Sequence, residues 1–217
     1  MSKRRVAILI SGRGSNMTAL IDAAKDKDFP AEIVLVASNV ANAGGLAKAQ
    51  ADGIKAITVE SKTFGKDREA FEHELHRELT AHKVELVCLA GFLRLLTPWF
   101  VKQWEGRMIN IQPALLPSYR GLHTHERARA DGVKIHGASV HFVVADVDSG
   151  PIIVQGAVAV HADDTPETLA ARVLQVEHRI YPQALQLVAS GKTTIDGAIC
   201  KTDGTTPPDG ALISPSS

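Results

Sequence analysis

Near its start the chain reads Arg5-Val-Ala-Ile-Leu-Ile-Ser-Gly-Arg-Gly-Ser-Asn16, an apolar run followed by two glycines. A continuous apolar run of this length is typical of a parallel strand that is buried on both faces. After the glycine turn, Ser15 or Asn16 can cap a helix whose apolar residues recur at helical spacing. Strand, glycine turn and helix in this order predict the first unit of an α/β sheet.

The next part of the chain repeats this alternation. Apolar runs predict strands at 32–38, 56–59 and 86–90, and helical patterns predict helices at 44–51 and 67–82. Strands separated by helices of this length form right-handed crossovers. The fold class predicted is therefore α/β, with a Rossmann-like, mostly parallel sheet and helices on both of its faces.

The pattern changes in the second half. A short helix near 98–103 and a buried strand at 107–111 precede a stretch, 113–136, that is rich in Pro, Gly, His and Tyr. The runs 137–144 and 151–160 show the alternation of antiparallel strands, and a last helix is expected over 166–189 with Thr165 as its cap. We therefore expect an antiparallel C-terminal addition, a single domain over 1–204 and a loose tail at 205–217.

Composition excludes several classes of partner. In 217 residues, 24 Lys and Arg balance 24 Asp and Glu, so no global field favours nucleic acid or an anionic membrane. The longest apolar runs, such as 6–10 and 84–90, fall far short of the roughly 20 residues that span a bilayer. Cys88 and Cys200 form no spaced pair, which fits a reducing compartment. We expect a cytoplasmic protein.

The glycine turn is a candidate anion site. Gly14 lets the backbone approach a ligand closely, the helix that follows offers free N–H groups, and Ser15 and Asn16 add donors. An ordinary tight turn is an equally good interpretation of these residues alone. The turn matches neither the dinucleotide fingerprint nor a P-loop. A single phosphate on a small substrate is therefore the expected ligand.

Polar residues also follow other strands at the edge where open sheets bind ligands. Asn110 and Gln112 lie on one side of their strand by alternation, and Gly91 ends the strand before it. Asp148 stands in an Asp-Ser-Gly-Pro turn. Taken singly, Asn110 and Asp148 are ordinary turn residues.

Seven motifs in one order resemble the phosphoribosylglycinamide formyltransferases of purine synthesis over nearly the whole chain. The motifs are Ile10-Ser-Gly-Arg-Gly-Ser-Asn16, Leu89-Ala-Gly-Phe-Leu-Arg94, Asn110-Ile-Gln-Pro-Ala-Leu-Leu-Pro117, Gly121-Leu-His-Thr-His125, Ser139-Val-His-Phe142, Asp148-Ser-Gly-Pro151 and Glu177-His-Arg-Ile-Tyr-Pro182. The resemblance implies a formyltransferase fold and the transfer of a formyl group from 10-formyltetrahydrofolate, as co-substrate, to the amine of 5-phosphoribosylglycinamide. It implies a monomer or homodimer that acts on small molecules, with a Leu116–Pro117 bond that is cis.

The resemblance also implies roles for residues. Gly14, Ser15 and Asn16 would hold the substrate phosphate, and Glu177 would contact the glycinamide. Asn110 would donate to the developing oxyanion, and Asp148 would orient a catalytic histidine and help to move a proton. The folate cleft would be bordered by Arg68, Leu93, Arg94, Leu95, Leu96, Val144, Ala145, Asp146, Val147 and Asp148.

This chain departs from the family pattern at Gln112, which stands where the family has its catalytic histidine. A glutamine amide donates a hydrogen bond but carries no charge and acts as no acid, so we expect slow transfer. The change is engineered or accidental, or natural with a compensating group, or it marks a binding protein. His123, His125 and His141 are the candidates for compensation.

Two rival functions remain open. A 10-formyltetrahydrofolate hydrolase resembles this catalytic core, but such proteins usually carry an N-terminal regulatory domain, whereas here the first strand starts at Arg5. A catalytically impaired folate- or phosphoribosyl-binding protein is favoured only by Gln112. His123 and His125 could bind zinc, but no third ligand has a convincing spacing, so no metal is expected.

Overall fold

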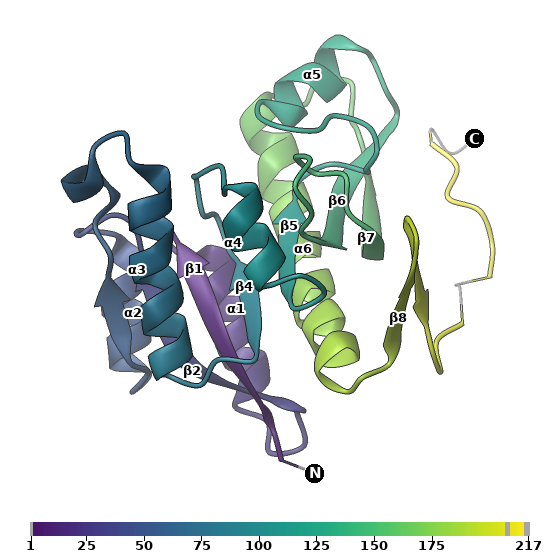
Figure 1. The fold of residues 1–217 in the computed structure, drawn as a ribbon. Helices are drawn as coiled ribbons and strands as arrows, with labels where there is room; N and C mark the ends of the chain where they lie inside the picture. Colours follow the sequence, from purple (N-terminus) through teal and green to yellow (C-terminus); the bar gives the residue numbers. More distant parts are fainter. Residues whose placement is uncertain (1, 207–208, 215–217) are drawn as a thin grey trace.

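The computed structural model describes residues 2–206 and 209–214. Its main sheet has the strand order β3-β2-β1-β4-β5-β6-β7 (Figure 1). The strands are β1 (Arg4–Ile10), β2 (Ala31–Ser38), β3 (Ala56–Thr58), β4 (Leu86–Leu89), β5 (Met108–Gln112), β6 (Ile135–Phe142) and β7 (Ile152–Ala159). Strands β1 to β5 pair with one another in parallel, which confirms the mostly parallel sheet.

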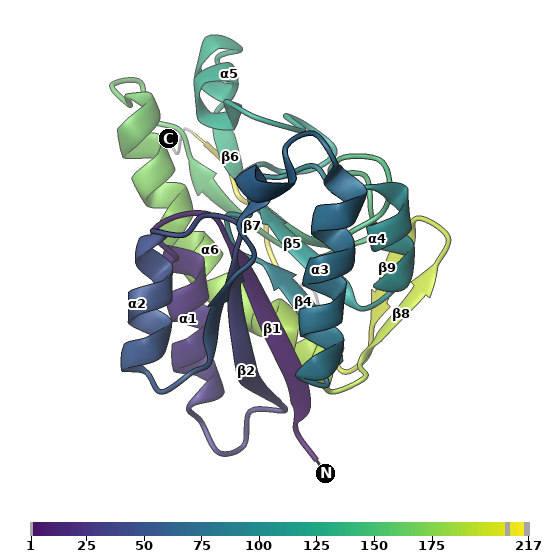
Figure 2. The ribbon, with the colours of Figure 1, turned by 60° about the vertical axis from the view of Figure 1, so that its left-hand side comes forward.

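Both faces of the sheet are covered, as predicted (Figures 1 and 2). Along β1, Val6, Ile8 and Ile10 belong to one buried cluster, and Ala7 and Leu9 to another. The first cluster also contains buried residues of α1 (Ser15–Ala24), α2 (Gly44–Ala51) and α6 (Pro166–Ala189), and the second those of α3 (Arg68–Ala81) and α4 (Pro98–Gln103). Alternate side chains of a central strand thus enter two cores, which is why this strand is apolar throughout.

The antiparallel addition is also confirmed. β5 pairs with β6 in a register that sets Asn110 opposite His141 and Gln112 opposite Ser139. β6 in turn pairs with β7, where a Cβ on Gly137 would lie 2.0 Å from the Gly156 carbonyl oxygen. Only glycine permits this approach. The reversal of direction at β5 places a second set of polar side chains beside the carboxyl end of the parallel strands.

Helix α6 packs against the parallel strands and the antiparallel addition alike. Thr165 caps it, as predicted, in a reciprocal pair of hydrogen bonds with Thr168. The buried Tyr181 hydroxyl lies 3.0 Å from the Leu89 carbonyl oxygen and 3.2 Å from that of Ile109. The helix is therefore tied to β4 and β5, the two strands that lead to the polar edge.

Some elements differ from the sequence-based expectation. A short helix, α5 (Thr124–Ala130), lies within the stretch 113–136, for which no helix had been predicted. It was missed because only Thr124 and Ala128 are buried, too few to give helical periodicity. A 3₁₀ turn, η1 (Ser61–Phe64), was also missed.

A hairpin of β8 (Thr193–Asp196) and β9 (Ile199–Thr202) had not been expected either, although its β-branched residues flank a glycine turn. The predicted tail has no helix or strand in residues 205–206 and 209–214, and its positions 207–208 and 215–217 lie outside the described residues. The domain limits therefore stay a prediction. Across 2–206 and 209–214, no helix combines the length and the apolar character needed to cross a bilayer.

Candidate functional site

The glycine turn joins β1 to α1 and leaves the helix N-terminus open. Gly14 has a φ of 71°, and a Cβ there would lie 3.0 Å from Met17 Cε and 3.1 Å from Gly45 Cα. Within the described residues no side chain caps α1, so the prediction that Ser15 or Asn16 caps it is wrong. Gly14 itself is the cap residue, because its left-handed conformation starts the helix. The first N–H groups of α1 are thus free for an anion.

Asn16 points away from a capping role and reaches α6. Its Nδ2 donates to Glu177 Oε2 at 2.6 Å, and both side chains are buried. Burial raises the pKa of Glu177, against the opposing effect of the Asn16 hydrogen bond. Asn16 Oδ1 has no hydrogen-bond partner among the described residues. The structure thus brings the turn and Glu177 together across 161 positions of sequence. Asn16 Oδ1 is left as a buried acceptor that a ligand can use.

Asn110 and Asp148 meet at His141. Asn110 Nδ2 lies 3.3 Å from His141 Nε2, and Asp148 Oδ1 lies 3.7 Å from the same nitrogen. The side chains of His141 and Asp148 are only 3% and 9% exposed. Because β5 and β6 are paired in register, Asn110 and His141 are direct cross-strand neighbours. The loop after β6 then returns Asp148 to the same place.

Gln112 and Asp148 share a third partner, Gly121. Gln112 Nε2 donates to the Gly121 carbonyl oxygen at 2.7 Å, and the Gly121 N–H donates to Asp148 Oδ2 at 2.8 Å. Burial alone would raise the pKa of Asp148, but the nearby His141 imidazole and the hydrogen bond from the Gly121 N–H outweigh it, so the pKa lies below its usual value. Asp148 is therefore a carboxylate at neutral pH. The segment before α5 is bound to both predicted catalytic positions.

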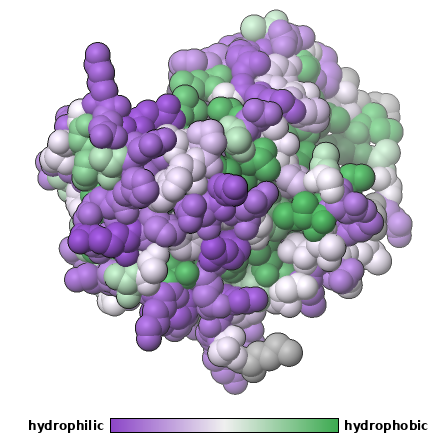
Figure 3. All heavy atoms as spheres, viewed as in Figure 1, coloured by the Kyte–Doolittle hydropathy of each residue, from purple (hydrophilic) through white to green (hydrophobic). Residues whose placement is uncertain are grey.

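Arg68 begins α3, and the other predicted folate residues lie in two loops, one after β4 and one after β6. Leu93 and Leu95 are 75% and 64% exposed, and residues 144–147 are also exposed. Arg68 Nη2 donates to the Leu95 carbonyl oxygen at 2.5 Å, and the Arg94 guanidinium lies 4.9 Å from the centre of the Phe71 ring. Both arginines thus brace the loop that follows β4. On the face in Figure 3, hydrophobic groups are exposed in the middle and on the right, while the left, over α3, is mainly hydrophilic.

Sequence reasoning missed the role of Ser11. Its hydroxyl donates to Asn39 Oδ1 at 2.5 Å and accepts the Leu93 N–H at 2.8 Å. It therefore links the residue before the glycine turn to the loop after β4. A hydroxyl directly after a buried strand was the available signal, because such a group needs partners. The cis Leu116–Pro117 bond that had been expected is present.

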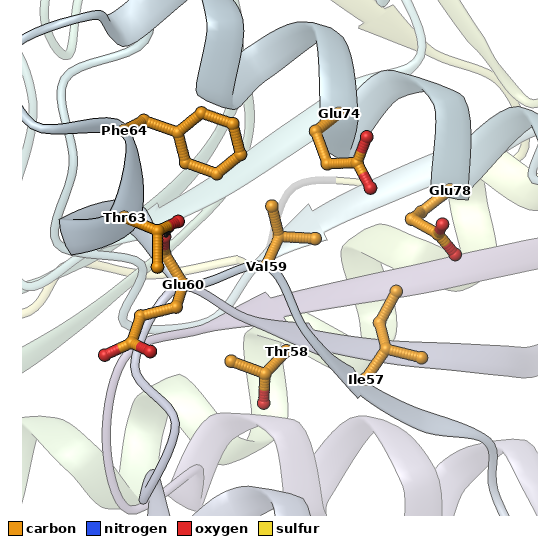
Figure 4. Close-up of a pocket in the computed structure, with 8 residues that line it drawn as sticks. All are labelled: Ile57, Thr58, Val59, Glu60, Thr63, Phe64, Glu74 and Glu78. Atoms are coloured by element: carbon orange, nitrogen blue, oxygen red, sulfur yellow. Dashed lines mark hydrogen bonds between the residues drawn. The ribbon is translucent and has the colours of Figure 1, made fainter.

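A hollow of about 430 Å³ lies elsewhere, between β3, η1 and α3 (Figure 4). Its lining includes the carboxylates of Glu60, Glu74 and Glu78, of which the last two pair with Arg77. None of the predicted site residues lines it. Because carboxylates repel phosphate, we place the candidate site at the carboxyl edge of the sheet instead.

Known proteins share both the sequence and the fold. Residues 4–185 match the formyl transferase family. Phosphoribosylglycinamide formyltransferase of Escherichia coli (strain K12) is 42% identical over 206 residues, 94% of this chain and 97% of that protein. A crystal structure of phosphoribosylglycinamide formyltransferase from Brucella melitensis is 52% identical, with a TM-score of 0.84, and the match covers 88% of this chain and 97% of that one.

Longer and more distant relatives complete the comparison. The trifunctional purine biosynthetic protein adenosine-3 of Gallus gallus is 48% identical over 92% of this chain, but the chain spans only 20% of its length. A formyltetrahydrofolate deformylase from Pseudomonas syringae pv. tomato has a TM-score of 0.86 at 25% identity, covering 93% of this chain and 66% of that one. The resemblance drawn from the seven motifs and the formyltransferase fold are confirmed. The chain belongs to the formyl transferase family.

Proposed function

We propose that this chain transfers the formyl group of 10-formyltetrahydrofolate to the amine of 5-phosphoribosylglycinamide, a step of purine synthesis. One observation carries the proposal: Asn110 and Asp148 both contact His141 at the sheet edge onto which the glycine turn opens. The 42% identity to the Escherichia coli phosphoribosylglycinamide formyltransferase supports it over nearly the full length of both chains.

The phosphoribosyl end of the substrate binds at the glycine turn. The free N–H groups at the start of α1, with the Ser15 hydroxyl, hold the phosphate. Glu177 and the unpaired Asn16 Oδ1 accept hydrogen bonds from the glycinamide N–H groups. A buried carboxylate near the amine also favours its attack, because it stabilises the positive charge that develops on nitrogen.

The folate binds between the loop of Leu93–Leu96 and the loop of Val144–Asp148. Exposed Leu93, Leu95 and Val144 offer apolar area to the pterin ring. Backbone groups of both loops supply its hydrogen bonds. Arg68 and Arg94 keep the first loop in place and leave cationic edges toward the acidic tail of the folate.

In the reaction the amine nitrogen bonds to the formyl carbon, and the carbonyl oxygen becomes an oxyanion. Asn110 donates to this oxygen. The new ammonium loses a proton toward Asp148, the folate nitrogen gains one, and the bond between that nitrogen and the formyl carbon breaks. Gln112 donates a hydrogen bond but holds no proton, so transfer is slow.

A paired assay of the chain and its Gln112→His variant tests this function. We expect formyl transfer by both, with a kcat about 10² to 10⁴-fold higher in the variant and little change in the Kd of either substrate. Gln112→Asn is the matched control: it keeps a neutral amide and should not raise kcat. An unchanged rate in Gln112→His would contradict the argument from acid catalysis.

The same assay separates the two alternatives. Formate release without the glycinamide substrate would indicate the hydrolase, which the lower identity of 25% to a deformylase makes the weaker candidate. Tight binding of both substrates, with no product even from Gln112→His, would indicate a binding protein.

We also propose that residues 1–204 suffice for activity, that the chain works in the reducing cytoplasm as a monomer or homodimer, and that residues 205–217 contribute nothing. Cys88 and Cys200 are both free thiols, which supports a reducing compartment. A chain ending at residue 204 should retain full kcat.

A further inference from the structure

Gln112 raises the question of which group can hold a proton at the catalytic edge. Asn110 and Gln112 are amides, which neither accept nor release a proton near neutral pH. The hydrogen bond from the Gly121 N–H and the nearby imidazole keep Asp148 a carboxylate, so at neutral pH it carries no proton to give. The folate nitrogen that leaves the formyl carbon, however, must receive a proton. A side chain in contact with these residues that already holds a proton can supply it before the new ammonium has given up its own.

His141 has the required chemistry and position. An imidazole is the side chain whose ordinary pKa lies nearest neutrality. Its Nδ1 lies 2.8 Å from the Phe142 carbonyl oxygen, so Nδ1 keeps its hydrogen as a donor. Nε2 is then the atom that gains and loses a proton, and it faces Asn110 Nδ2 and Asp148 Oδ1.

The other two candidate histidines face elsewhere. His123 is exposed and lies 3.4 Å from Glu126 Oε1. His125 packs edge-to-face against the His136 ring, with centroids 5.3 Å apart. Of the three histidines that the sequence offered as compensating groups, only His141 is thus in contact with Asn110 and Asp148 among the described residues.

We propose that His141, acting through Asp148, is the proton-holding residue of this chain and performs part of the task that Gln112 cannot. The proposal rests on the proposed function. The neutral form of His141 accepts from Asn110 Nδ2, and the protonated form donates to Asp148 Oδ1. Its two hydrogen-bonding states therefore use the two groups that touch the reacting atoms.

The proton transfers through His141 and Asp148 conserve protons. The pair of His141 and Asp148 starts with one proton, on Nε2. As the bond between formyl carbon and folate nitrogen breaks, Asp148 gives a proton to that nitrogen and receives the Nε2 proton in its place. The ammonium nitrogen of the tetrahedral intermediate returns one proton to the pair. No net proton is gained or lost, and His141 stays a positioning residue that never touches the substrate.

Few charged groups bear on this pair. From the loop after β6 Asp148 faces His141, while the cross-strand neighbours on β5 and β7 are the uncharged Asn110 and Ile152. Arg120 acts on Asp148 from the segment before α5 and favours its ionised form. A pH dependence of catalysis assigned to this pair must therefore change when either His141 or Asp148 is replaced.

The decisive experiment is a cycle of His141→Gln in the chain and in its Gln112→His variant. In the chain we expect His141→Gln to lower kcat about 10²-fold and to remove the loss of kcat at rising pH that marks an essential acid. In the Gln112→His background the same change should cost less than about tenfold, because a second imidazole is present. His123→Gln is the matched control and should leave kcat unchanged.

Equal losses in both backgrounds, or an unaltered pH profile, would overturn the proposal in favour of a structural role. If His141→Gln fails to fold, an NMR titration of the unaltered chain decides. The NMR signal of His141 Nε2 should show both protonation states as the pH is changed, and Asp148→Asn should alter this response because Asp148 Oδ1 faces that nitrogen. A signal that shows a single protonation state throughout sinks the idea. Absence of product from both the chain and Gln112→His would instead refute the proposed function, and the titration distinguishes the two failures.

Discussion

At the glycine turn the N–H groups of α1 lack a side-chain cap within the described residues and Asn16 Oδ1 lacks a partner, whereas at the catalytic edge Gln112 and Asp148 are both bonded to Gly121. The turn is rigid and ready for an anion, because Gly14 is packed against Met17 and Gly45. The catalytic edge has satisfied its polar groups internally. Substrate must therefore replace Gly121 at Asp148, while it displaces nothing but solvent at the turn. Binding and chemistry should respond to different substitutions.

The largest effect should come from Asp148→Asn. We expect kcat to fall about 10² to 10⁴-fold, because the variant removes the group that exchanges protons with the substrate. The Kd of the glycinamide substrate should stay within a few fold, since Asp148 lies at the other end of the site. Steady-state kinetics and calorimetry measure the two quantities, with exposed Asp163→Asn as control. A Kd that changes as much as kcat would remove the distinction between the two regions.

The second-largest effect should be a loss of folding stability in acid, which comes from His136 near the catalytic edge. Burial, followed by the nearby His125, lowers the pKa of His136 to about 4, and the Pro113 carbonyl offsets this only in part. Because the folded pKa lies below the unfolded value of about 6.5, the stability is complete above pH 6.5 and is lost as the pH falls toward 4, by about 3 kcal/mol. Urea unfolding between pH 7.5 and 4.5 measures the loss. The loss of unfolding free energy between these two pH values should be smaller in His136→Gln. An equal loss in both chains would refute the assignment to His136.

The turn itself is tested by Gly14→Ala. A side chain in this left-handed conformation costs about 1–2 kcal/mol, and its Cβ would press on Met17 and Gly45. We expect about tenfold weaker binding of the glycinamide substrate with kcat at saturation preserved. Gly12→Ala is the matched control, since a Cβ there meets nothing within 4 Å. Equal effects of the two substitutions would mean that the shape of the turn does not matter.

The smallest effect should come from Ser11→Ala. The change leaves Asn39 Oδ1 and the Leu93 N–H without this partner, at a cost of about 1 kcal/mol. Folate affinity should fall a few fold, because Leu93 begins the loop that borders the folate. Ser190→Ala, at the end of α6, serves as control. Unaltered folate binding would show that the loop keeps its position without the Ser11 hydroxyl, through contacts such as that of Arg68 with the Leu95 carbonyl oxygen.

Much of this molecule could be predicted from the sequence because its signals are local. The apolar run at 5–10 indicated a strand buried on both faces, and the motifs of Asn110, Asp148 and Glu177 placed the candidate site. The bonds of Gly121 to Gln112 and Asp148 could not be predicted, since they join three segments whose approach depends on tertiary packing. For the same reason the sequence could not choose among His123, His125 and His141, which only the pairing of β5 with β6 separates.

The Tyr181 hydroxyl is bound to carbonyl groups of β4 and β5, and this fixes the rotation and axial position of α6 relative to the sheet. Glu177 precedes Tyr181 by four residues, about one helical turn, so both lie on the same side of the helix. One residue inserted between them would swing Glu177 by about 100° around the axis and out of reach of Asn16. An insertion between Glu177 and Tyr181 should therefore abolish the contact of Glu177 with Asn16 even where the Tyr181 hydroxyl keeps its place.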